Sequence, residues 1–232
     1  MKTRTGATAL LAAAATLLLP GCATTVSGNA AAPANLTVAS APVEQQAAAP
    51  MGSAQDAVEV PLDSLVRASV RSSALFWQTL GVNVDVEPSR VDGELACAGS
   101  TAPGSSAIFC ATTTFDLIKY DPALLNQRRA DGGDLAVRIT MAHEVGHAAQ
   151  EAEGLRNSYP SREAKELAAD CASGAALADA GVARADAKAA IPATALGKKN
   201  PGSPLTPTQR TGAFFDGFDG TVSPMGCLSY TG

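Results

Sequence analysis

The chain of 232 residues is 46% hydrophobic and only 4% aromatic, and its 22 acidic residues outnumber its 17 basic residues, which gives a net charge of −5. No basic stretch is interleaved with aromatic residues, so we expect no nucleic-acid partner. No glycine-rich phosphate loop follows a predicted strand, and no serine lies in a Gly-x-Ser-x-Gly pattern, so neither a nucleotide site nor a serine hydrolase is expected.

The first 21 residues have the pattern of a secretory signal peptide. Lys2 and Arg4 precede an apolar run at 7–19, which is too short to span a bilayer. The run ends in Leu-Pro-Gly-Cys, which resembles the bacterial lipobox, whose cysteine is lipidated after cleavage. We therefore expect lipidated Cys22 to anchor the protein to a bacterial cell membrane, on its extracytoplasmic face. The alternative is a plain secretory signal with a coincidental cysteine.

Residues 22–57 are predicted to form a flexible tether that starts at the lipidated Cys22. They are rich in Ala, Pro, Ser, Gln and Gly and have few apolar anchors. Such a segment cannot bury enough surface to offset the entropy cost of becoming ordered. Residues 58–232 remain, and they are long enough for one domain of ordinary size.

This domain begins with a predicted helix that short strands follow. Apolar residues from Leu62 to Leu80 recur at helical spacing and stop before Gly81. Three short strands are predicted after it, at 82–86, where valines alternate with polar residues, at 107–111 and at 115–120.

A helix predicted at 134–153, ending at Gly154, contains the only two histidines of the chain in a His-Glu-x-x-His pattern. His143 and His147 stand four residues apart and share a helix face, so both imidazoles can reach one ion. Zinc binds neutral imidazole, and a catalytic site needs three protein ligands and an open position for water. Glu144 is placed to accept a proton from that water. The pattern also arises by chance, so the hypothesis depends on a third ligand.

A candidate third ligand lies on the next predicted helix, which runs from Ser161 to Gly181 with Ser161 as its N-cap. Glu166 and Asp170 stand four residues apart and share a face of this helix. We expect Glu166 to bind the metal and Asp170 to accept the free ring N–H of a ligating histidine. Glu163 is a rival ligand one turn earlier, but no acidic residue follows it four positions later.

A last helix is predicted to start at Thr206, where Thr-Pro-Thr-Gln forms a capping box with proline in the first helical position. Helices therefore dominate the domain and the sheet is small. The sequence predicts an α+β, mostly helical fold.

The two central motifs resemble those of the neutral zinc metallopeptidase family of bacteria. That family combines His-Glu-x-x-His-x-x-Gln with Glu-Leu-x-Ala-Asp-Cys, found here at 143–150 and 166–171. Weaker similarities extend over about 60–230: Phe76-Trp77, Phe109-Cys110, the segment 115–121, Thr208-Gln209-Arg210, the segment 214–218 and Cys227. Family members often carry a histidine just before the Gln-Arg segment, whereas 199–203 has none. The resemblance implies a zincin-like (gluzincin-like) core built around the His-Glu-x-x-His helix.

The chain has five cysteines, which would leave one unpaired in an exported protein. If Cys22 carries lipid, four remain, and four cysteines allow three pairings. The family resemblance implies the disulfide pairs Cys97–Cys110 and Cys171–Cys227. No Cys-x-x-Cys pair is present, which argues against cysteine ligands for zinc.

The sequence thus predicts an extracytoplasmic zinc metallopeptidase, a hydrolase that cleaves a peptide or protein substrate. Zn2+ would be held by His143, His147 and Glu166, and Glu144 would act as general base. Three side chains have suitable donors to stabilise the transition state, and the sequence does not choose among them: Tyr120, Tyr159 and Arg210. The alternative is a non-catalytic envelope lipoprotein with a structural or vestigial zinc site, although such a site needs no general base.

Overall fold

The computed structural model describes residues 59–98, 100–113, 115–199 and 203–232. The predicted signal peptide at 1–21, the anchor Cys22 and the tether at 22–57 lie outside these residues and stay predictions. The described residues all belong to one unit, Ala54–Gly232. Among them, no helix is both long enough and apolar enough to cross a bilayer.

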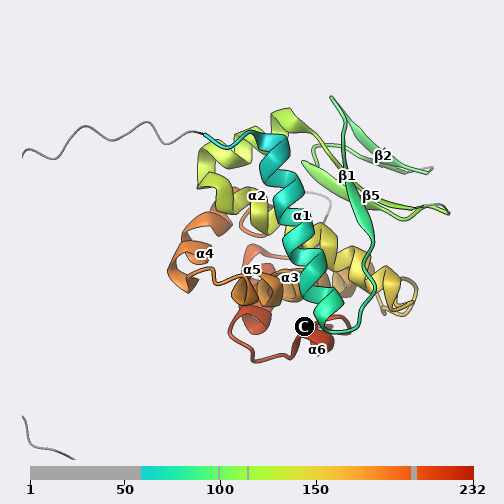
Figure 1. Cartoon of the computed structure of the whole chain (residues 1–232). Helices are drawn as coiled ribbons and strands as arrows, with labels where there is room; N and C mark the ends of the chain where they lie inside the picture. The colour runs from blue at the N-terminus through green and yellow to red at the C-terminus, as the bar shows by residue number, and fades with distance from the viewer. Residues whose placement is uncertain (1–58, 99, 114, 200–202) are drawn as a thin grey trace, which may run out of the picture. The chain divides into compact units, whose positions relative to one another are not determined.

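Helices make up most of the described chain (Figure 1). They are α1 (Leu62–Thr79), α2 (Pro122–Ala152), α3 (Arg162–Asp179), α4 (Arg184–Ala190), the 3-10 turn η1 (Ile191–Ala193), α5 (Pro207–Phe218) and α6 (Pro224–Cys227). The strands are β1 (Val86–Arg90), β2 (Leu95–Cys97), β3 (Ser100–Ala102), β4 (Ala107–Cys110) and β5 (Asp116–Tyr120). The predicted α+β, mostly helical class is therefore confirmed.

The strands form two small sheets. The larger one has the order β1-β5-β4, in which β1 runs parallel to β5 and β4 runs antiparallel to it. Strands β2 and β3 form a separate antiparallel hairpin. The strands predicted at 107–111 and 115–120 are confirmed as β4 and β5, whereas the hairpin was not predicted. Because β4 pairs on one side only, it is an edge of the larger sheet.

The strand predicted at 82–86 is wrong, since β1 begins where that segment ends. Val82 and Val84 lie in the connection after α1, where the Val82 N–H donates to the Trp77 carbonyl. The Val84 carbonyl accepts a hydrogen bond from the Gln78 side chain at 2.7 Å instead of from a neighbouring strand. Both valines are nevertheless buried. Their alternation with polar residues therefore indicates that the connection is buried, and not that it forms a strand.

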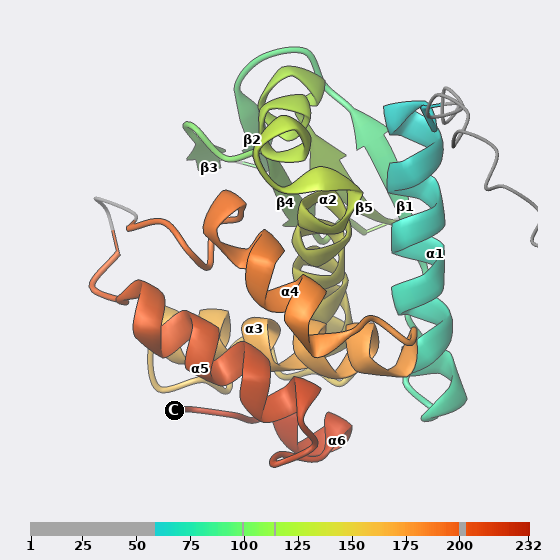
Figure 2. The same cartoon turned by 90° about the vertical axis from the view of Figure 1, so that its left-hand side faces the viewer.

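Helix α2 starts twelve residues earlier than predicted, at Pro122 rather than at 134. The Asp121 side chain caps it by accepting from the N–H groups of Ala123 and Leu124. Gly133, with φ +69°, breaks the helical backbone just before the predicted start. Gly132 and Gly133 thus form a kink that separates an unpredicted N-terminal segment from the predicted part, which carries both histidines. Figure 2 shows α2 running beside α1 with the sheet behind it.

The starts of α3 and α5 are confirmed. The Ser161 hydroxyl accepts from the Ala164 N–H at the start of α3. The Thr206 hydroxyl accepts from the Gln209 N–H, and the Gln209 side chain accepts from the Thr206 N–H, which completes the predicted capping box. The short elements α4, η1 and α6 were not predicted.

Glycines allow the helices around the site to pack closely. A Cβ atom on Gly146 of α2 would lie 3.1 Å from the Ala169 carbonyl of α3. A Cβ on Gly174 of α3 would collide with the Phe214 carbonyl of α5. Helix α3 is therefore held between α2 and α5 at distances that larger residues would not permit, and this brings its carboxylates within reach of the histidines.

Both cysteine pairs that the resemblance implies lie at disulfide distance. Cys97 and Cys110 join β2 to β4 with a Cα–Cα distance of 5.5 Å. Cys171 and Cys227 join α3 to α6 with a Cα–Cα distance of 5.2 Å. The first bridge fixes the hairpin against the sheet edge, and the second ties the helix carrying the acidic residues to the C-terminal segment.

Candidate metal centre

Three side chains on two helices converge on one point. His143 and His147 of α2 and Glu166 of α3 each offer a ligand atom, and these atoms all lie within 4.8 Å of one another. The His143 Nε2 lies 3.4 Å from Glu166 Oε2, and the His147 Nε2 lies 3.7 Å from Glu166 Oε1. Tetrahedral bonds of about 2.0–2.1 Å would put ligand atoms about 3.3 Å apart. The group could therefore hold a metal ion.

The other ring nitrogen of each histidine is engaged away from this point. The His143 Nδ1 lies 2.8 Å from Asp170 Oδ1. The His147 Nδ1 lies 2.9 Å from Gln150 Oε1. The Gln150 oxygen is an acceptor, so the His147 ring is held with Nδ1 as the donor. The His143 Nδ1 is in close ion-pair contact with Asp170, without the geometry of a hydrogen bond. In both rings Nε2 faces Glu166 and is the atom that can bind a metal. Asp170 thus lies beside the ring nitrogen of His143 that faces away from Glu166.

Asp170 is itself held by Arg210 of α5. The arginine donates from Nε to Asp170 Oδ2 and from Nη2 to Oδ1, both at 2.8 Å, and the carboxylate has no exposed surface. A third donor, Nη1, contacts the Ala195 carbonyl at 3.3 Å. Such a two-point pair fixes the carboxylate in orientation as well as in position. Arg210 was a candidate for stabilising the transition state, and in the structure it binds Asp170.

Gln150 is fully buried and performs the same task for His147. Its amide nitrogen donates to the Lys165 backbone carbonyl of α3 at 3.0 Å, so its oxygen is turned towards the histidine. Sequence reasoning gave this glutamine no role beyond its place in the motif. Its position three residues after His147, on the same helix face, was the signal that could have indicated one.

The electrostatics of the group favour a positive charge between the ligands. Burial lowers the pKa of His143, but its contacts with Asp170 and Glu166 outweigh burial and raise the pKa to about 10. Burial raises the pKa of Glu166, yet His143, His147 and Arg210 hold it well below the usual range. Burial lowers the pKa of His147, which keeps that ring neutral. A site with these preferences attracts a proton or a metal cation.

Glu144 lies on α2 between the two histidines in sequence and is nearly buried. Its Oε2 accepts a hydrogen bond of 2.7 Å from the backbone N–H of Phe109 in β4. Within the described residues, no hydrogen bond reaches its other oxygen. One oxygen is thus fixed by the sheet edge while the second stays available for proton transfer.

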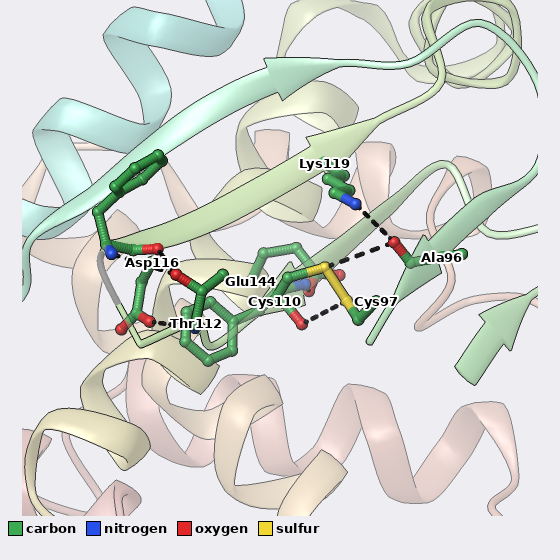
Figure 3. The surroundings of a disulfide bond; sticks show 9 residues. Ala96, Cys97, Cys110, Thr112, Asp116, Lys119 and Glu144 are labelled. Carbon is green, nitrogen blue, oxygen red and sulfur yellow. Dashed lines mark hydrogen bonds between the residues drawn. A yellow bond between two sulfur atoms is a disulfide. The ribbon is translucent and has the colours of Figure 1, made fainter. Parts of the chain in front are cut away.

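The disulfide Cys97–Cys110 lies beside this contact (Figure 3). The Cys97 Sγ lies 3.5 Å from the carbonyl oxygen of Phe109, the residue whose N–H binds Glu144. On the other side of the bridge, Lys119 Nζ donates to the Ala96 carbonyl at 2.7 Å. The disulfide therefore fastens β4, the strand that orients Glu144, to the β2–β3 hairpin, and the Lys119 contact links the neighbouring strand β5 to the same hairpin.

A cleft of about 700 Å³ opens onto the group. Its walls come from the segment 101–109, from α2, from the first turns of α3 and from the chain around 195–210, and the charged side chains that line it are Arg128, Glu144, Arg162, Glu163, Lys165, Glu166 and Arg210. A flexible polymer such as a peptide could reach the histidines along this cleft.

Two of the three donors among which the sequence did not choose lie outside the cleft. The Tyr120 hydroxyl donates to Asp63 of α1 at 2.9 Å, and the Tyr159 hydroxyl donates to the Leu228 carbonyl near the C-terminus. Neither tyrosine lines the cleft. Glu163, the rival ligand, lines the cleft but does not belong to the group around the histidines.

Comparisons of the chain with protein-family models, with curated proteins and with solved structures found no match. The membership in a neutral zinc metallopeptidase family and the zincin-like core therefore stay predictions from the motifs. The function has to be argued from the geometry of the site.

Proposed function

We propose that the protein is a zinc-dependent peptidase whose metal ligands are His143, His147 and Glu166. The observation that carries the proposal is that both Nε2 atoms face Glu166 while both Nδ1 atoms are engaged by buried acceptors. Two imidazoles and one carboxylate are a donor set found in catalytic zinc sites of peptidases, which leave a fourth position for water or substrate.

The charges around the group favour a cation. Glu144 and Glu166 are acidic, and Asp170 is paired with Arg210. Without a metal, a proton on His143 supplies the positive charge between the ligands, because the contacts with Asp170 and Glu166 raise its pKa to about 10. A metal ion bound at Nε2 would take the place of that proton.

The residues of the chain have distinct tasks in the proposed hydrolysis. Zinc in such a site lowers the pKa of a bound water and polarises the scissile carbonyl. Glu144 accepts the proton of the attacking water at the oxygen that is free of the Phe109 contact, and then passes that proton to the leaving amine. Asp170 and Gln150 keep the histidine rings oriented.

The proposal includes the predicted family, core and location. It takes the protein to be a neutral zinc metallopeptidase with a zincin-like core, anchored by lipid on the extracytoplasmic face of the membrane. The two disulfides support that location, because disulfides persist in an oxidising compartment. The alternative, an envelope lipoprotein with a structural or vestigial zinc site, would leave the position of Glu144 at the open cleft without a purpose.

Hydrolysis of an unbiased peptide mixture by the zinc-loaded protein tests the proposal. Glu144→Gln is expected to keep zinc and fold but to lower turnover about 100- to 10,000-fold, because it removes the base and not a ligand. Glu151→Gln is the matched control, since it makes the same change on the same helix outside the metal cleft. Full activity of zinc-replete Glu144→Gln would refute the mechanism.

A further inference from the structure

Three cations that line the metal cleft have no ion pair with a described residue: Arg128, Arg162 and Lys165. Among these, Arg128 is the one whose side chain is held by hydrogen bonds to described residues. Arg128 lies in the N-terminal segment of α2, before the glycine kink, and lines the same cleft as His143 and Glu144. In the part of the chain that the structure describes, its guanidinium makes no ion pair. Arg210, in contrast, is paired with Asp170, and Arg129, the next residue along α2, is paired with Glu59 and Asp134.

Two neutral contacts fix the Arg128 side chain. Its Nε donates to the Ser106 hydroxyl at 2.5 Å, and its Nη1 donates to the Ala193 carbonyl at 3.2 Å. Ser106 is buried and lies just before β4, while Ala193 belongs to η1. The arginine is therefore held rigidly between three elements of the cleft wall, and its position does not depend on a ligand.

The remaining donors lie on two neighbouring nitrogens. A guanidinium has five N–H groups. The two contacts with described residues use two of them, which leaves one on Nη1 and both on Nη2. The edge of the planar group between Nη1 and Nη2 matches the two oxygens of a carboxylate.

The surroundings of Arg128 make a counter-charge favourable. Burial lowers the pKa of its guanidinium, an effect that the negative charge of Glu144 partly offsets. The group has thus lost hydration without gaining a bound anion, and an arriving carboxylate would compensate that loss. Arg128 and the proposed base Glu144 line the same cleft, so one bound substrate could contact both.

We propose that Arg128 is a substrate-binding residue that selects peptides with a carboxylate close to the scissile bond, either an acidic side chain or a free C-terminus. A cleft of about 700 Å³ has a width on the order of 11 Å if taken as a sphere, which is the reach of about three extended residues. The carboxylate therefore lies within that distance of the bond. The peptide nature of the ligand rests on the proposed function, whereas the anion site rests on Arg128.

Two other cations of the cleft are less suited to this task. Arg162 and Lys165 lie in the first turns of α3, and Arg162 is exposed. Among the described residues, neither side chain is held by a hydrogen bond, so each has conformational entropy to lose on binding. Lys165 also lacks the planar fork. We assign the selective contact to Arg128 and use Lys165 as a comparison.

Binding of matched synthetic peptides to the full, zinc-loaded Glu144→Gln protein tests the assignment without turnover. Each peptide carries Glu or Gln at one position, scanned along the chain, and each is made with a free or an amidated C-terminus, which separates the two sources of the carboxylate. We expect about 10- to 100-fold tighter binding of the best carboxylate peptide than of its amide counterpart, as for a two-point charged contact.

When Arg128→Gln is added to the Glu144→Gln protein, the ratio of the affinities for the carboxylate peptide and its amide counterpart should fall to near one, while the zinc content stays the same. Arg129→Gln, the same change one residue away and outside the cleft, should keep the ratio. Arg128→Lys carries the test if the glutamine variant does not fold, and it should lower the ratio several-fold because the fork is lost. An equal loss in Lys165→Gln would overturn the assignment, since the whole cleft and not Arg128 would then select.

The outcomes separate the two proposals. A ratio near one in the Glu144→Gln protein with Arg128 intact, or no peptide binding at all, overturns the assignment of Arg128. A ratio that depends on Arg128 supports it even if the zinc-loaded protein with intact Glu144 cleaves none of these peptides, a result that would count against the peptidase proposal alone.

Discussion

The two histidines of the candidate metal centre are held alike by supports of different electrical character. Behind His143 stands the Asp170 carboxylate, paired with Arg210. Behind His147 stands the Gln150 amide, which donates to a backbone carbonyl. Both supports lie against Nδ1 and leave Nε2 facing Glu166, so the geometry of the site needs no charge there. The negative charge of Asp170 behind His143 must therefore affect something other than the orientation of the ring.

The charged support differs from the neutral one in reach as well. It links α2 to α3 and on to α5, because Arg210 contributes from the last long helix. The neutral support links α2 to α3 only. A carboxylate behind a ligating imidazole also makes the ring more basic and so a stronger ligand. We therefore expect metal affinity to depend more on the His143 side than on the His147 side.

Removing the ligand that both histidines face should have the largest effect. Glu166→Ala takes away one of three ligands, and we expect metal affinity to fall by more than about 100-fold, since each ligand of a zinc site contributes roughly 3 kcal/mol. Metal titration with a competing chelator measures this. Glu163→Ala, one turn earlier on α3, is the matched control. If Glu163→Ala strips the metal and Glu166→Ala retains it, the ligand assignment is wrong.

Breaking the charged support should come next. Asp170→Asn keeps the shape but removes the charge behind His143, and we expect about 10- to 100-fold weaker metal binding. The asparagine is the better variant, because Asp170→Ala would take away both strong hydrogen bonds of the buried Arg210 and cost about 3–5 kcal/mol of stability. Chelator competition on the folded variant gives the affinity, and thermal unfolding of the metal-free protein checks that the fold survives.

Breaking the neutral support should have the smallest effect. Gln150→Met fills nearly the same volume but removes both amide contacts, and the loss of one neutral hydrogen bond to His147 should weaken metal binding about 5-fold, or about 1 kcal/mol. The same chelator titration applies. A larger loss than in Asp170→Asn would show that the two supports do not differ as we describe.

Much of this site could be predicted because its signals are local. The four-residue spacing of His143 and His147 and that of Glu166 and Asp170 put each pair on one helix face, and the structure brings the two faces together. Gln150 follows the same local rule at spacing three. The caps at Ser161 and Thr206 were also readable, since a cap needs only neighbouring residues.

The rest depends on contacts between distant segments. Nothing near Arg210 in sequence shows that it pairs with Asp170 forty positions earlier, and nothing near Tyr120 shows that it faces Asp63. Likewise, Arg128 and Arg129 are identical neighbours, and only the fold gives one an acidic partner and the other a place in the cleft. The alternating valines led to the wrong prediction of a strand at 82–86 for a related reason. Burial alone does not make a strand, which also needs a distant segment to pair with.

The most direct test of the metal centre is the metal-edge X-ray absorption spectrum of the zinc-loaded protein. We predict two nitrogen ligands of the imidazole type at about 2.0–2.1 Å, carboxylate oxygen from Glu166 and one exchangeable water ligand. The water contribution should disappear when a chelating hydroxamate is added. A spectrum with sulfur ligands at about 2.3 Å, or with four protein ligands and no exchangeable water, would contradict a catalytic zinc site at His143, His147 and Glu166.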